Sequence, residues 1–184
     1  IITIANIHNN IKNCFEEIAD IDEHCARLIS NYSKKFPFVL EGEVPQNTNG
    51  FESIINMCAK VLGINSSKEF EDMALNTSMT SGIQIDMKLV SLDGINYLDY
   101  RRTVQSIMAY KMADVDNITL IYSFYESLSE FICNYVNEIA KDVETKDVVL
   151  CGNMFANSIL LSKTNKTLSK SYNIILPKEY PLDY

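Results

Sequence analysis

The stretch from Asp147 to Leu161 reads DVVLCGNMFANSILL, which is an apolar strand pattern followed by one glycine and then a helical pattern. A glycine at such a junction lets backbone amides approach a phosphate group. Asn153 follows the glycine, and asparagine tolerates a left-handed backbone better than other non-glycine residues. We therefore predict that the turn Cys151-Gly152-Asn153 keeps strand-to-helix geometry and points its amides toward a phosphate position.

Two strands and a helix must position this turn. A second apolar run, NIILP, begins at Asn173. Strand, helix and strand in this order predict a crossover unit with parallel strands at about 147–151 and 173–176 and a helix at about 154–169. Both runs are typical of buried strands. Ligands bind at the carboxyl ends of such strands, so the candidate site lies at 151–153 and after Pro177.

Helical periodicity dominates the N-terminal part of the chain. Apolar residues at three- and four-residue spacing predict one amphipathic helix from Ile7 to Ile29. Residues 33–50 are rich in proline and glycine, which predicts a loop with a short extended piece at 38–40. A second helix follows from Phe51 to Leu62, with Gly63 as its C-terminal cap.

The middle of the chain predicts three more helices and a hairpin. Ser66 or Ser67 starts a short helix, and residues 83–89 alternate apolar and polar side chains before Gly94 and INYL, which indicates a small antiparallel hairpin. A helix is expected from about 99 to 112. Asp116 or Asn117 then caps a long helix that reaches about 141. The expected fold class is helix-rich α/β.

Charge and cysteine content exclude several partners. The 184 residues carry a formal net charge of −8, which argues against a nucleic-acid partner. No apolar run approaches membrane-spanning length, so no membrane partner is expected. The five cysteines form no C-x-x-C pair, which indicates reduced thiols in a cytoplasmic protein.

Several blocks in a fixed order resemble one family. The C-terminal domain of the HypF-type carbamoyltransferases has similar blocks at similar spacing over roughly residues 50–184. The blocks are FEDMA at 70–74, SFYESL at 123–128, VVLCGNMFANSILL at 148–161 and IILPKEYPLD at 174–183. The resemblance implies an actin-like ATPase fold of ribonuclease H-like type. It also implies two units, with 1–48 as a remnant of the first lobe and 49–184 as the second lobe.

The resemblance also implies the site residues. In that family the turn and its surroundings hold ATP, which places Gly152 and Asn153 at the phosphate turn, Asn157 in the following helix, and Glu71 as a ribose contact. Asp183 falls at the position of a metal-ligating aspartate.

Several family residues are replaced in this chain. Asn153 stands for the second glycine of the turn, and Tyr125 stands for a histidine. An overlay of residues 4–17 puts Asn6 and Asn10 where the family has metal-binding histidines. Amide oxygens are poor ligands for the iron or zinc ion of the intact family. We therefore expect no bound cofactor.

The implied function is hydrogenase maturation. The intact family passes a carbamoyl group from carbamoyl-adenylate to a cysteine of a HypE-like partner. This chain is expected to be either a working, diverged member or a shortened descendant that has lost the activity, because the replacements fall at chemical positions. The alternative is a non-catalytic binding or scaffold protein that retains the fold without nucleotide or metal chemistry.

Overall fold

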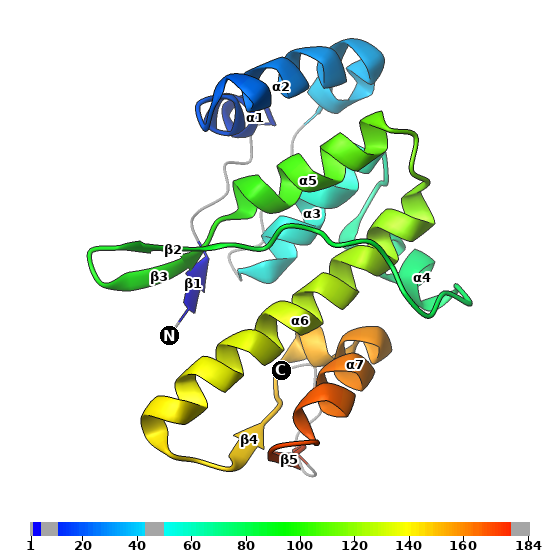
Figure 1. Ribbon diagram of the computed structural model, residues 1–184. Coiled ribbons are helices and arrows are strands. Elements are labelled where there is room, and N and C mark those ends of the chain that lie inside the picture. Colours follow the sequence, from blue (N-terminus) through cyan, green and yellow to red (C-terminus); the bar gives the residue numbers. More distant parts are fainter. Residues whose placement is uncertain (1, 5–10, 43–49, 178–184) are drawn as a thin grey trace.

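The structure is a computed structural model that describes residues 2–4, 11–42 and 50–177 (Figure 1). Helices make up most of the described chain. The α-helices are α1 Ile11–Ala19, α2 Glu23–Lys35, α3 Phe51–Leu62, α4 Ser67–Leu75, α5 Tyr100–Met112, α6 Asn117–Val143 and α7 Ser158–Leu168. Two short 3-10 helices are η1 Pro37–Leu40 and η2 Asn153–Ala156. The expected helix-rich α/β class is confirmed.

Two small sheets lie apart from each other (Figure 1). In the first sheet β1 (Ile2–Ile4) is parallel to β3 (Ile95–Leu98), which pairs antiparallel with β2 (Leu89–Leu92). In the second sheet β4 (Asp147–Val149) is parallel to β5 (Asn173–Ile175), with Val148 opposite Ile174. The predicted parallel pair is confirmed, and the predicted hairpin is confirmed at its turn and second strand but not over most of its first strand.

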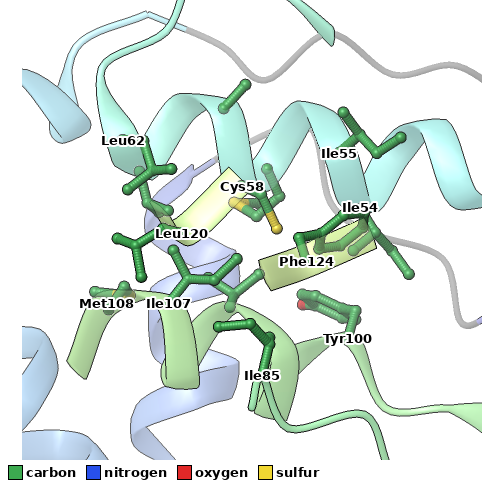
Figure 2. Packing of buried hydrophobic residues seen from close by; sticks show 14 of the residues in the cluster. Ile54, Ile55, Cys58, Leu62, Ile85, Tyr100, Ile107, Met108, Leu120 and Phe124 are labelled. Atoms are coloured by element: carbon green, nitrogen blue, oxygen red, sulfur yellow. The ribbon is translucent and has the colours of Figure 1, made fainter. Parts of the chain in front are cut away.

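Helix α6 is the central element of the core. It packs against α4, α5 and α7, and its Phe124 lies among Ile54 and Cys58 of α3 and Ile107 of α5 (Figure 2). Phe124 also makes an edge-to-face contact with Phe70 of α4, with ring centroids 5.6 Å apart. Such pairs add about 0.5–1.5 kcal/mol to the free energy gained from burial. Phe124 is therefore a core residue, as the periodicity predicts, whereas Phe131 and Tyr135 of the same predicted stripe are only half-buried.

The N-terminal segment differs from the single helix that its periodicity predicts. The described residues form two helices, because the chain turns at Asp20 and Ile21 and restarts at Asp22. The Asp22 carboxylate accepts a hydrogen bond from the backbone N–H of Cys25 at 2.8 Å and so caps α2. The apolar stripe continues across the break, which is why periodicity alone joined the two helices.

The segment after α2 is also more regular than expected. Helix α2 continues to Lys35, and residues 37–40 form η1 instead of an extended piece. Pro37 stands at the first position of η1, where its fixed backbone angle favours a helical turn. Pro37, which suggested a loop, therefore marks the start of a 3-10 helix, and Pro45 lies outside the described residues.

The strands β4 and β5 are shorter than the predicted strands, and one of their faces is exposed. One face, with Val148 and Ile174, packs with Cys133 of α6 and Leu168 of α7. On the other face Val149 is 58% exposed and Ile175 is 42% exposed. A continuous apolar run predicts a strand whose two faces are both packed against other elements. In the described part of the chain, helices pack against only one face. The prediction of buried strands is therefore wrong for this face.

Residues 80–88 form an extended segment, here called the strap, that lies beside α6 without pairing in a sheet (Figure 1). The predicted hairpin strand therefore starts six residues late, at Leu89. Serine hydroxyls replace the missing strand partner: Ile83 N–H donates to Ser123 Oγ and Ile85 N–H donates to Ser127 Oγ, each at 2.9 Å. Side chains thus satisfy amides that a neighbouring strand would otherwise bind.

A salt bridge fastens the start of the strap. Lys163 of α7 pairs with Glu126 of α6, and its ammonium also donates to the carbonyl oxygen of Thr80 at 3.0 Å. The other carboxylate oxygen of Glu126 accepts from Gly82 N–H at 2.5 Å. These contacts connect the strap, α6 and α7.

We predict that Gly82→Ala destabilises the protein. A Cβ at position 82 would overlap Ser123 Oγ and lie 2.9 Å from Ser123 Cα, so the strap would have to move away from α6. Overpacking of this kind costs about 1–3 kcal/mol. Urea unfolding followed by circular dichroism should show the loss, whereas Ser81→Ala, at the neighbouring exposed position, should unfold like the wild type. Equal midpoints for both variants would contradict the close approach.

Candidate nucleotide-binding site

The turn after β4 depends on Gly152. Its φ is +103° and its ψ is 154°, a combination that only glycine adopts without strain. A Cβ at this position would meet no atom within 4 Å, so the backbone conformation alone requires glycine here. Asn153 does not take a left-handed conformation and instead begins η2. The expectation that Asn153 would need a left-handed backbone is wrong, because Gly152 alone makes the reversal.

The turn does not lead directly into an α-helix. Helix α7 starts at Ser158, four residues later than expected, because η2 comes between. Within η2, Phe155 N–H donates to the carbonyl oxygen of Gly152 at 3.0 Å. The Asn157 side chain accepts from the N–H groups of Ile159 and Leu160, both at 3.1 Å. The first amides of α7 are therefore capped by the protein itself and do not point at an external anion.

Asn157 also connects two elements that are far apart in the sequence. Its side chain is buried, and its Nδ2 donates to Glu71 Oε1 of α4 at 3.1 Å. The carboxylate of Glu71 is thereby held next to the N-terminus of α7. Two of the residues implied by the family resemblance thus meet across 86 positions, with Asn157 as the residue that orients Glu71.

A cavity of about 320 Å³ lies between α3, α4, α6 and η2, and we call it the Glu71 pocket. Asn153 also lines it, so the structure brings the predicted residues Glu71 and Asn153 to one cavity. Gly152 comes directly before the lining residue Asn153 in the chain. Asn157 does not line the pocket but is hydrogen-bonded to Glu71, which does. The lining residues are Glu52, Ile55, Ser67, Lys68, Glu71, Tyr125, Asn153, Met154 and Ala156.

The pocket combines apolar walls with a few charges. Tyr125 is almost completely buried, and burial together with the negative charge of Glu71 raises the pKa of its phenol, which therefore stays a neutral group. Ser67 donates to Glu52 at 3.3 Å. Lys68, in the first turn of α4, adds a cation. Sequence reasoning missed Lys68, since a lysine next to a helix start is usually an exposed surface residue.

The described residues do not offer a metal site. No group of three or more His, Cys, Asp or Glu side chains gathers in the ranges 2–4, 11–42 and 50–177. Glu17, the last residue of the segment overlaid on the family's metal ligands, accepts a hydrogen bond from Tyr100 at 2.6 Å. Asp183, Asn6 and Asn10 lie outside the described residues. The expectation that no iron or zinc ion is bound therefore stays a prediction, since its residues lie outside the described chain.

A family model decides which proteins this chain belongs with. The model described as "Carbamoyltransferase, Kae1-like Domain, second subdomain" (HypF_C_2) matches residues 16–183. The chain belongs to this family. The resemblance found in the sequence blocks is confirmed, while the division into units 1–48 and 49–184 stays a prediction.

One named relative is similar to this chain over most of the chain's length. Protein HydE of Wolinella succinogenes is 25% identical to this chain over an alignment of 184 positions. The alignment covers 92% of this chain and 33% of HydE. The chain therefore spans about a third of the length of this relative. No helix among the described residues is long and apolar enough to cross a membrane.

Two HypF crystal structures share the fold. Full-length HypF in the phosphate- and nucleotide-bound form superposes with a TM-score of 0.66 at 16% identity, covering 93% of this chain and 23% of HypF. HypF of T. kodakarensis superposes with a TM-score of 0.59 at 14% identity, covering 73% of this chain and 18% of that protein. The likeness shows that this chain shares the fold of a part of HypF, and the expected fold class is confirmed to that extent.

We predict that Asn157→Ala destabilises α7 and releases Glu71. The variant loses a helix cap and leaves the carboxylate without its amide partner, which together cost about 1–3 kcal/mol. Chemical unfolding should measure this loss. Asn165→Ala, on the exposed surface of the same helix, is the control and should change stability by less than about 0.5 kcal/mol. A variant at 157 as stable as the control would show that the bridge to Glu71 contributes nothing.

Proposed function

We propose that this chain acts in hydrogenase maturation as a HypF-related protein that keeps the nucleotide pocket of the carbamoyltransferase domain but binds nucleotide weakly. The observation that carries the proposal is the Glu71 pocket, which joins α4 to the η2 turn at the position that the family resemblance assigns to ATP. The likeness to a HypF structure in a nucleotide-bound form supports it.

The pocket suits a nucleoside better than a chain of phosphates. Met154, which is half-buried, supplies apolar surface for a base, and the largely buried Ile55 and Tyr125 line the same pocket. The carboxylate of Glu71, already oriented by Asn157, accepts hydrogen bonds from ribose hydroxyls. The lining residues include two carboxylates, Glu52 and Glu71, and one ammonium group, Lys68. Their net charge is negative, so the pocket repels a triphosphate.

Phosphate binding at the turn is weakened by the chain itself. Asn157 occupies the amides at the start of α7, and the side chain of Asn153 lines the space that glycine would leave open. Each charge-assisted hydrogen bond that is lost costs about 1.5–3 kcal/mol. Loss of two or three of them moves a micromolar site to millimolar affinity or weaker.

Any carbamoyl transfer then depends on other proteins or segments. In the family that the sequence resembles, the acceptor is a cysteine of a HypE-like partner, and we propose such a maturation protein in the cytoplasm as the partner here. The amides capped by Asn157 equally favour the second candidate, a scaffold that keeps the fold without nucleotide chemistry. Nucleotide titration separates the two candidates.

We predict that the wild-type chain binds ATP with a Kd of about 1 mM or weaker and that Asn153→Gly strengthens binding at least tenfold. The glycine removes a side chain from the pocket and lets the turn amides approach a phosphate. Isothermal titration calorimetry measures both affinities, with Asn165→Gly as the control for an asparagine-to-glycine change outside the pocket. Micromolar binding by the wild type would overturn the proposal, and no binding by either protein would favour the scaffold.

We also predict that the purified chain carries no stoichiometric iron or zinc. The reason is the asparagine at positions 6 and 10, since neutral amide oxygens bind these ions poorly. Elemental analysis by inductively coupled plasma mass spectrometry checks this after dialysis against buffer without chelator. About one tightly held transition metal per chain would contradict the overlay of residues 4–17.

A further inference from the structure

A groove of about 490 Å³ is formed by the strap, the first residue of β2, α5 and α6. It shares no lining residue with the Glu71 pocket. We call it the aromatic-acidic groove. Its lining residues are Gln84, Asp86, Met87, Leu89, Ser106, Tyr110, Ser127, Glu130, Phe131, Asn134, Tyr135 and Glu138.

The walls of the groove are fixed by hydrogen bonds. Ser127 of α6 accepts from Ile85 N–H at 2.9 Å, and Ser106 of α5 accepts from Asp86 N–H at 3.2 Å. The strap is therefore attached to both helices that flank it. A groove whose walls are already in place loses little conformational entropy when a ligand enters.

The inner surface of the groove is aromatic. Tyr110 comes from α5, and Phe131 and Tyr135 come from consecutive turns of α6. All three rings are half-buried, so each presents part of its surface to the groove. Aromatic faces of this kind attract the planar guanidinium of arginine and the stem of lysine.

Carboxylates stand along the rim above these rings. Glu130 and Glu138 lie two turns apart on α6 with Asn134 between them, which places them about 12 Å apart along the helix. Neither glutamate forms an ion pair with another residue in the ranges that the structure describes. Asp86, on the opposite wall, lies 3.4 Å from Lys88 in an ion pair that is largely exposed.

We propose that the aromatic-acidic groove binds a basic peptide segment of a partner protein. Two arginine side chains four residues apart in an extended peptide project from the same side, about 13 Å apart, which matches the separation of Glu130 and Glu138. The guanidinium groups pair with these carboxylates while their stems cover Phe131 and Tyr135. The net charge of −8 increases the rate of encounter with such a segment.

The open length of the groove favours a peptide over a small organic cation. A single cation would engage only one of the two glutamates, whereas an extended segment reaches both and also covers the aromatic rings between them. The same two-point contact gives the groove a preference for the spacing of the basic side chains.

Fluorescence anisotropy with the labelled heptapeptide ARALARA tests the proposal. We expect binding with a Kd below 1 mM at low salt and at least fivefold weaker binding at higher salt, as screening requires. The double variant Glu130→Gln and Glu138→Gln should bind at least tenfold more weakly. The control is Asp142→Asn with Glu16→Gln, which removes the same charge from exposed positions outside the groove and should bind like the wild type.

Three results would overturn the proposal. They are no rise in anisotropy up to about 1 mM protein, equal weakening by the two double variants, and displacement of the peptide by an equal concentration of spermidine. The last would assign the groove to small cations. A peptide with citrulline in place of both arginines keeps the shape and loses the charge, so it should fail to bind. None of these measurements depends on ATP, so the outcome is independent of the proposed nucleotide function.

Discussion

The burial of α6 is the constraint on which the other elements depend. Residues 120–125 are buried without interruption, so this part of the helix is covered on all sides and not only along one stripe. Each fully buried apolar side chain contributes about 1.5–3 kcal/mol. A helix covered in this way needs α3, α4, α5 and α7 around it, and its buried serines need hydrogen-bond partners. The strap supplies amides to Ser123 and Ser127, and Thr164 of α7 donates to Ser129. Helix α7 also brings the η2 turn beside α4.

This arrangement puts two different surfaces on one helix. Tyr125 lines the Glu71 pocket, while Phe131 and Tyr135 line the aromatic-acidic groove farther along the same helix. In the pocket, Ser67 is hydrogen-bonded to Glu52, and Glu71 is held by Asn157. The groove is wider and has an exposed acidic rim. A protein that lost affinity for nucleotide at the first surface could still associate with partners through the second.

Helix ends and the order of elements could be predicted from the sequence because capping is local. Ser66 and Asp116 cap α4 and α6, and Gly63 ends α3 in a left-handed conformation, as their residue types indicate. The strap could not be predicted, because an alternating pattern does not reveal that serines on a helix will replace a partner strand. The exposure of Val149 could not be predicted either, since the same β-branched residues occur in buried and in solvent-exposed strands.

The site was predictable only in part. The family resemblance identified Glu71 and Asn153 as site residues, and the structure places both in the lining of one cavity. The role of Asn157 as a cap that also holds Glu71 depends on a contact between α4 and α7, which no local pattern contains. Lys68 carries no sequence signal of its own, because its importance comes from the pocket beside it.

The serine contacts of the strap also determine how its backbone amides exchange with solvent. In a sheet, an amide becomes accessible when a neighbouring strand separates. Here the N–H groups of Ile83 and Ile85 are bonded to side chains of a helix, so they become accessible when the strap lifts away while α6 stays intact. Deuterium uptake at these two positions therefore reports the opening of the strap separately from the unfolding of the core. Because the strap forms one wall of the groove, the same motion changes the shape of that surface.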